Sequence, residues 1–101
     1  MWSIKTFAEL SNQELFNIYY LRVKTFVVEQ NRVYQEVDAY DPNAIHVFNE
    51  VDGHVNAYAR VFLKDNTVTF GRVVTAADKR GSGLGPVSYT HLRAHETLAN
   101  L

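Results

Sequence analysis

The chain contains no cysteine among its 101 residues, which excludes disulfide bonds, cysteine-ligated zinc and thiol catalysis. It also has no excess of either charge, because ten Lys and Arg stand against eleven Asp and Glu. Nucleic-acid and membrane-surface binders normally carry a basic excess, so we expect neither partner. No apolar run approaches the ~20 residues that span a bilayer, and the N-terminus lacks the pattern of a signal peptide. These absences predict a cytoplasmic protein.

Prolines and glycines are also few, two and five respectively, and no linker or internal repeat is visible. What the chain does have is apolar residues, which make up 47% of it, with aromatic residues at 13%. That share is enough to bury a core. The length is enough for one small domain and not for two. We therefore expect a single domain.

A strong helix start lies near the N-terminus. Ser11 and Glu14 have the spacing of a capping box, in which each side chain accepts a hydrogen bond from the other residue's backbone N–H. Apolar residues continue at helical spacing, which predicts a helix over about 11–27. A short strand over 4–7 is expected before it. The polar, acidic stretch 29–44 is expected to be a loop.

The middle of the chain has the pattern of an antiparallel meander. A strand over 46–51 is followed by Asp52-Gly53, the best two-residue hairpin signal. The next strand, about 54–63, alternates apolar and polar residues, which places one apolar set on one face: Val55, Ala57, Ala59 and Val61. Lys64-Asp65-Asn66 predicts a second turn, and 67–75 a third strand. Gly71 inside this strand is typical of a bulge or a close backbone approach.

A glycine-rich turn follows the meander, with the sequence Arg80-Gly81-Ser82-Gly83-Leu84-Gly85. Alternate glycines let several backbone N–H groups converge on an anion, and Arg80 can add a charge-assisted bond to a phosphate oxygen. The spacing is neither the Walker nor the Rossmann pattern. Spacing alone leaves phosphate binding and a plain surface turn equally open.

The order of strand, R-x-x-G-x-G and helix resembles the acyl-coenzyme A signature of the GNAT superfamily of N-acetyltransferases, with Arg80, Gly83 and Gly85 at its defining positions. Further segments resemble the ElaA-like branch of that superfamily: LRVKTFVVEQ at 21–30, YQEVD at 34–38, AYAR at 57–60 and FGRVV at 70–74. The resemblance covers about residues 2–85.

The resemblance implies an α/β domain of the α+β type, with an incomplete GNAT acyl-CoA N-acyltransferase fold. Its parts are a helix, an antiparallel meander, a phosphate-binding turn and a further helix. Residues 1–85 form the partial GNAT domain. Residues 86–101 leave the family pattern and resemble a translated adapter sequence, although their apolar spacing permits a helix. The helix that usually carries the general acid is missing from the pattern, so we expect this chain to be weakly active or inactive.

The implied activity is transfer of an acetyl group from acetyl-CoA to a primary amine of a small molecule or peptide, without a metal. The resemblance assigns coenzyme binding to the strand and the glycine turn: Val73, Val74, Arg80, Gly81, Ser82, Gly83, Leu84 and Gly85. Two alternatives stay open. One is a non-catalytic acyl-CoA-binding remnant, and the other is a relative of acyl-homoserine-lactone synthases.

The general base is expected at Glu29, which directly follows the predicted helix. Four residues are candidates for substrate binding: Arg22, Gln30, Tyr34 and Asp38. Acidic loop residues also commonly serve as caps and turn formers. Arg22 lies on the apolar stripe of the helix, where a buried ion pair with an acidic partner is the simpler interpretation.

Three further interpretations come from histidines, arginines and the sheet edge. His46 opens a strand with nothing nearby to orient it, which favours a structural role. Arg60 and Arg72 fall within strands, so each needs a carboxylate or water. His91 and His95 have the spacing of metal ligands on a helix, but no third ligand is evident and no metal is expected. An exposed sheet edge predicts association between copies of the chain.

Overall fold

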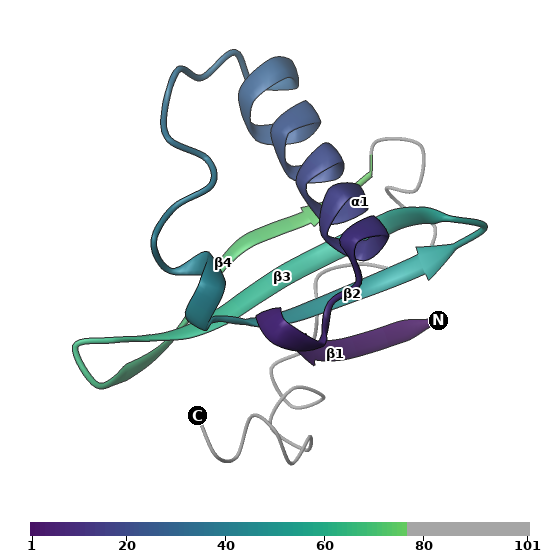
Figure 1. Ribbon diagram of the computed structural model, residues 1–101. Coiled ribbons are helices and arrows are strands. Elements are labelled where there is room, and N and C mark those ends of the chain that lie inside the picture. Colours follow the sequence, from purple (N-terminus) through teal and green to yellow (C-terminus); the bar gives the residue numbers. More distant parts are fainter. Residues whose placement is uncertain (77–101) are drawn as a thin grey trace.

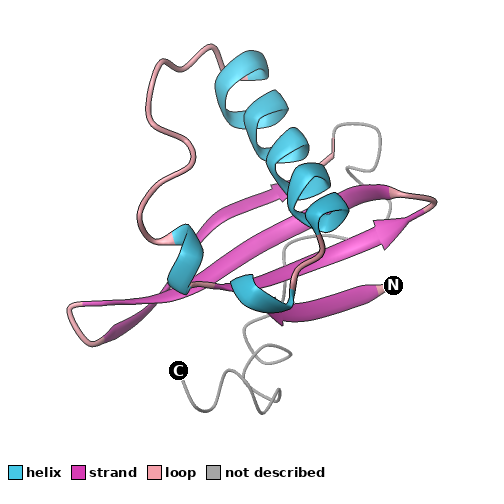
Figure 2. Ribbon diagram, viewed as in Figure 1, coloured by secondary structure: helices cyan, strands magenta, loops and turns pink. Residues whose placement is uncertain are grey.

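The computed structural model describes residues 1–76, which form a sheet with a helical layer on one face (Figures 1 and 2). Four strands make up the sheet: β1 (Trp2–Thr6), β2 (Ile45–Val51), β3 (His54–Lys64) and β4 (Thr67–Thr75). They lie in the order β1-β2-β3-β4, and every neighbouring pair is antiparallel. The predicted meander is therefore confirmed. The opening strand is shifted by two residues at its start, and a 3-10 turn at Phe7–Glu9 follows it.

The helical layer begins where the capping box predicts. Ser11 Oγ accepts a hydrogen bond from the Glu14 backbone at 3.0 Å, and Glu14 Oε1 accepts one from the Ser11 backbone at 2.8 Å. Helix α1 (Asn12–Arg22) then continues without a break into a π-helical segment (Val23–Glu29). The wider π turns carry the helical layer two residues past the predicted end. Such segments are frequent at functional sites.

The core lies between α1 and the sheet. On that face, Ile18 and Leu21 of the helix pack with Phe48, Tyr58 and Val74 of three strands. The opposite face of the sheet has its own apolar cluster: Ile45, Val47 and Val61, with Trp2 and Ile4 packed against it. β2 and β3 are almost completely buried, and they carry buried apolar residues on both faces.

Both hairpin turns have the backbone that a two-residue loop requires. Asp52 and Gly53 have φ values of 52° and 78°, and Asp65 and Asn66 have values of 53° and 62°. Two successive left-handed residues match the right-handed twist of the flanking strands. The predicted turns are correct, except that Lys64 belongs to β3.

The predicted alternation of β3 fails near its start. Asn49 pairs with Ala57 and Glu50 with Val55, so Asn56 is an extra residue between them. This bulge moves Val55 to the helix side of the sheet, where it joins Tyr58 in the core. The sequence pattern had placed Val55 with Ala57, because strict alternation assumes an unbroken ladder.

A second bulge interrupts β4 next to Gly71. Gly71 pairs with Arg60 and Val74 pairs with Tyr58, so Arg72 and Val73 together face one residue of β3. The predicted interruption is confirmed. The left-handed residue is not the glycine, however, because Arg72 has a φ of 52°.

Candidate functional site

The helix-side face of the sheet carries a cluster of charges. Three arginines come from α1, β3 and β4, and three carboxylates come from the loop 30–44 that returns from the helix to the sheet (Figure 1). The predicted loop is not wholly irregular, because a 3-10 helix, Asp41–Asn43, lies near its end. We call the three arginines and three carboxylates the ion cluster: Arg22, Arg60, Arg72, Glu36, Asp38 and Asp41. Its formal charges cancel, which is a condition for burying so many ionised groups.

Arg22 is the innermost member, with 0% of its surface exposed. Its Nε atom lies 2.5 Å from Glu36 Oε1, and its two terminal nitrogens bond both carboxylate oxygens of Asp41 at 2.7 and 3.2 Å. The guanidinium also lies over the rings of Tyr19 and Tyr58. The predicted buried ion pair is confirmed. The side chain presents no surface to a substrate and instead ties the loop to the helix.

Arg60 holds the same loop to β3. Its terminal nitrogens form a two-pronged contact with Asp38, at 2.7 and 2.9 Å, and one of them also donates to Asp41 at 3.0 Å. The guanidinium lies beside the paired rings of Tyr40 and Phe62, within 5.9 and 4.9 Å of their centres. Hydrogen bonds from Arg60 hold the pKa of Asp38 below its usual value. Burial opposes ionisation of Asp41, but hydrogen bonds from Arg22, from the Asp38 backbone and from Arg60 keep its pKa low.

Arg72 holds the loop to β4. Its Nε atom is ion-paired with the Glu36 carboxylate, and one terminal nitrogen donates to the Glu36 carbonyl at 3.0 Å and to Asp38 at 3.2 Å. The guanidinium lies 5.3 Å from the centre of the Tyr34 ring, whose hydroxyl donates to Glu36 Oε2 at 2.8 Å. Tyr34 and Asp38, both predicted on the substrate side, are thus parts of this arrangement.

His46 and Tyr58 form a neutral pair beneath the cluster. His46 Nε2 lies 3.0 Å from the carbonyl oxygen of Asp41, so this nitrogen must carry the proton. Nδ1 is then the acceptor of the Tyr58 hydroxyl at 2.6 Å. Burial lowers the pKa of His46 and raises that of Tyr58, so both stay uncharged. These contacts agree with a structural role for His46.

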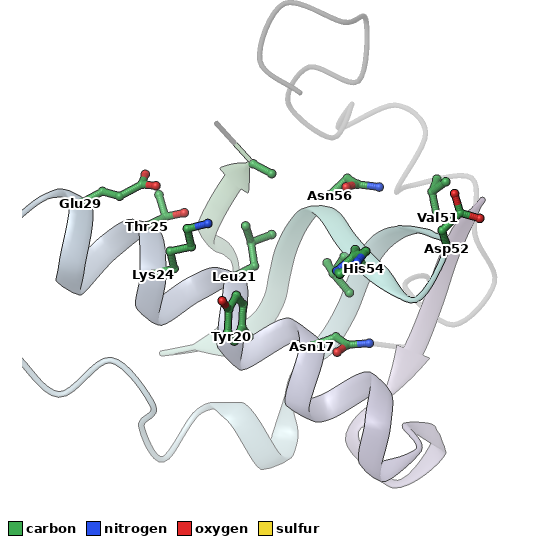
Figure 3. Close-up of a pocket in the computed structure, with 12 residues that line it drawn as sticks. Asn17, Tyr20, Leu21, Lys24, Thr25, Glu29, Val51, Asp52, His54 and Asn56 are labelled. Atoms are coloured by element: carbon green, nitrogen blue, oxygen red, sulfur yellow. The ribbon is translucent and has the colours of Figure 1, made fainter. Parts of the chain in front are cut away.

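A groove of about 520 Å³ lies between the helical layer and the β2–β3 turn (Figure 3). Lys24 and Glu29 line it from the π segment, Asp52 from the turn and His54 from the start of β3. It reaches Ala76, directly after β4. Charged groups of both signs on two facing walls suit a polar ligand. Glu29, the predicted base, therefore lines a groove, whereas Arg22 and Asp38 belong to the ion cluster and Tyr34 is bonded to it through Glu36.

The remaining predicted residues fall in two places. Gln30 caps the π segment through its backbone N–H, which donates to Thr25 at 3.1 Å, and its side chain is exposed. Val73 and Val74 lie at the β4 bulge, the first half exposed and the second buried. The glycine turn 80–85 and the segment 86–101 are outside the described residues.

The sequence predicts that Arg60 and Arg72 each need a carboxylate or water, but it does not identify Glu36, Asp38 and Asp41 as the partners. The available signal was that Arg60 and Arg72 are charged residues within strands and that the stretch 29–44 of the same chain is acidic. Within residues 1–76, no group of His, Asp and Glu side chains is arranged to hold a metal ion. No helix in this part of the chain is long and apolar enough to cross a membrane.

The chain is similar to several known proteins, although no family model matches it. A UPF0039 protein of Schizosaccharomyces pombe is 42% identical over 83 residues, which is 80% of this chain and 55% of that protein. Protein ElaA of Escherichia coli is 34% identical over 89 residues, which is 83% of this chain and 58% of ElaA.

Two solved structures share the fold. The crystal structure of Escherichia coli ElaA matches with a TM-score of 0.80 at 33% identity, covering 84% of this chain and 60% of that one. An acyl-CoA N-acyltransferase from Pseudomonas aeruginosa matches with a TM-score of 0.77 at 38% identity, covering 82% and 60%. The chain spans less than two thirds of the length of all these relatives.

The four-stranded antiparallel sheet with its helical layer has the fold of the GNAT acyl-CoA N-acyltransferases. The sequence and structure matches narrow this class to one branch. The chain is an ElaA-like member of the GNAT superfamily, and it corresponds to the N-terminal portion of its relatives.

Proposed function

We propose that the chain carries the acyl-CoA-binding part of an N-acetyltransferase, which transfers the acetyl group of acetyl-CoA to a primary amine of a small molecule or peptide. The observation that carries this proposal is the β4 bulge. Arg72 and Val73 leave the regular ladder there, so backbone groups of β4 are free to pair with the amides of a pantetheine arm. Val73 is 46% exposed at this position, which leaves room for a ligand.

The chemistry is direct attack of a neutral amine on the thioester carbonyl. The new C–N bond forms, the C–S bond breaks, and coenzyme A leaves as the thiolate, which takes up the second proton that the nitrogen gives up. A backbone N–H at Val73 or Val74 donates to the carbonyl oxygen as negative charge develops on it. Glu29 takes the proton of the incoming ammonium through water. Its place in the groove that reaches the end of β4 supports this role.

The remaining assignments follow the family resemblance. Arg80, Gly81, Ser82, Gly83, Leu84 and Gly85 hold the pyrophosphate through backbone N–H groups and the Arg80 charge. Gln30, whose side chain is exposed, binds the substrate. We assign Arg22, Tyr34 and Asp38 to holding the loop rather than to binding substrate, because their polar atoms are bonded within the fold. We place the protein in the cytoplasm and propose residues 1–85 as the partial domain.

Calorimetric titration of the chain with coenzyme A and with adenosine tests the binding site. Gly83→Val should weaken coenzyme A more than adenosine, because its side chain blocks the approach of the phosphates alone. Arg80→Ala should cost about 1.5–3 kcal/mol of binding free energy, the scale of a hydrogen bond to a charged group. Equal affinity of the wild type and both variants for coenzyme A would contradict the site.

A thiol-release assay with simple primary amines tests turnover. A non-catalytic acyl-CoA-binding remnant is the second candidate. Binding without thiol release favours the remnant. Thiol release that Glu29→Gln lowers at least about a hundredfold, the lower end of the usual contribution of a positioned base, favours the enzyme.

A further inference from the structure

Arg72 adopts a backbone conformation that its side chain disfavours. Its φ of 52° lies in the left-handed region, where glycine is at ease and a bulky residue is strained. Gly71, directly before it, does not take that conformation. A strained residue persists only when its surroundings hold it, and such residues cluster at functional sites. The left-handed backbone of Arg72 therefore requires contacts that hold it in place.

The loop segment 34–38 holds it from three directions. The Glu36 carboxylate is ion-paired with Nε, and the Glu36 carbonyl and the Asp38 carboxylate both accept from a terminal nitrogen. The Tyr34 ring lies against the guanidinium plane, and the Tyr34 hydroxyl steadies the Glu36 carboxylate. These contacts join residues more than 30 positions apart in the chain.

The segment 34–38 is itself fixed from behind. Arg22 bonds the other oxygen of Glu36, and Arg60 bonds both oxygens of Asp38. Because Arg22 and Arg60 are buried, the two carboxylates have little freedom to follow a moving Arg72. The bulge of β4 is thus attached through one side chain to the rigid centre of the molecule.

We propose that the segment 34–38 is a positioning clamp, which holds Arg72 left-handed and so sets the direction of the Val73 and Val74 backbone groups in the acyl-CoA slot. This inference rests on the proposed function. Arg72 is a positioning residue in it, since its side chain points to the loop and acts on the ligand only through the strand.

The test compares Arg72→Ala with Arg72→Gly in the 101-residue chain. Both variants lose the clamp, but glycine adopts a positive φ without strain and alanine does not. Arg72→Ala should lose about tenfold in affinity for acetyl-CoA, the scale of one strained residue, and Arg72→Gly should recover most of that loss. Arg32→Ala, which removes an arginine from the exposed start of the loop, is the matched control and should bind as the wild type does.

Amide hydrogen exchange supplies a readout that needs no ligand. The amides of the β3–β4 ladder on either side of the bulge should exchange faster in Arg72→Ala, and Arg72→Gly should restore their protection. Amides of the β2–β3 ladder report whether each variant is folded. Wild-type affinity and exchange in Arg72→Ala would overturn the clamp. Equal losses in both variants would also overturn it, because the guanidinium would then act directly. A wild type that binds no acetyl-CoA removes the proposed function, and the exchange rates still decide whether the clamp exists.

Discussion

At the scale of single residues, the ion cluster is the most consequential feature. Its six members lie in the interior or at its margin, where an ionised group without a partner is costly. Each carboxylate meets at least two arginines or an arginine and a backbone N–H. The contribution of any one member to the stability of the fold therefore depends on which charged groups its removal leaves without a partner.

Replacement of Arg22 by Met should destabilise the fold strongly. The variant leaves Asp41 and Glu36 buried without their principal partner, which costs about 3–5 kcal/mol in comparable cases. Lys5→Met is the control, because its ion pair with Glu14 at 2.8 Å lies near the surface and is worth about 0–1 kcal/mol. Urea denaturation measures both. Similar losses in the two variants would show that the cluster adds nothing beyond a surface pair.

The stability of the fold should fall on mild acidification because of His46. Burial keeps its pKa in the folded state below the usual value of 6.5. As the pH drops below 6.5, the unfolded chain takes up a proton that the folded chain excludes, so unfolding becomes easier. A second fall should follow at lower pH, because the pKa values of Glu14, Asp38 and Asp41 lie below their usual 4.5, 3.8 and 3.8, so these carboxylates are protonated first in the unfolded chain.

Urea midpoints measured from pH 7.5 to pH 3 separate the two contributions. His46→Gln should flatten the fall between pH 7 and 5 and leave the acidic one in place. His54→Gln is the control, because His54 is exposed at the start of β3. A wild-type midpoint that does not change between pH 7 and 5 would contradict a buried neutral imidazole.

At the scale of elements, the β2–β3 turn and the β4 bulge differ in whether they require glycine. Gly53 occupies a left-handed position in open space, with a φ of 78°. A Cβ added at Gly71 would meet Phe62 and Arg60 only at 3.7 and 3.8 Å, which is ordinary contact. The turn therefore needs its glycine for backbone conformation, while the strand tolerates a small side chain.

Gly53→Ala should consequently cost about 1–2 kcal/mol, the penalty of a left-handed residue with a Cβ. Gly71→Ala should be neutral, or should stabilise by up to about 1 kcal/mol, because alanine reduces the freedom of the unfolded chain. Thermal or urea denaturation of the two variants side by side checks this order. A larger loss at Gly71 than at Gly53 would mean that the bulge requires glycine itself.

At the scale of the whole molecule, apolar side chains remain uncovered at the tip of the β3–β4 hairpin. Leu63 and Val68 face each other across the hairpin and are 46% and 49% exposed, and Phe70 is exposed nearby. Within residues 1–76, β4 pairs with β3 alone, so its outer edge has no strand beside it. Exposed apolar surface beside an open edge favours association.

Sedimentation velocity should show a sedimentation coefficient that rises with concentration. Val68→Lys should reduce the association, because a charged side chain at a sheet edge opposes pairing. Val33→Lys is the matched control, since it makes the same change in the exposed loop away from the sheet. A monomer at all concentrations, or equal effects of both variants, would contradict association through this edge.

The local elements were predictable from sequence because their signals are local. The capping box at Ser11 and Glu14 and the turn at Asp52-Gly53 act through backbone geometry within four residues, and both appear as expected. The family resemblance, carried by short segments along the chain, pointed to the fold. The position of Arg22 on the apolar stripe of the helix also indicated a buried ion pair with an acidic partner.

Only the tertiary structure decided which charged side chains form ion pairs with one another. Arg72 joins Glu36 across 36 positions, and the two bulges set which residues of β3 and β4 face the helix. Each bulge shifts a strand by one residue and so exchanges its faces, which no alternation pattern records. Ion pairs between distant segments depend on that register. The sequence by itself therefore determined the elements and their order, whereas packing decided how the charges of the loop reach the strand proposed to bind acyl-CoA.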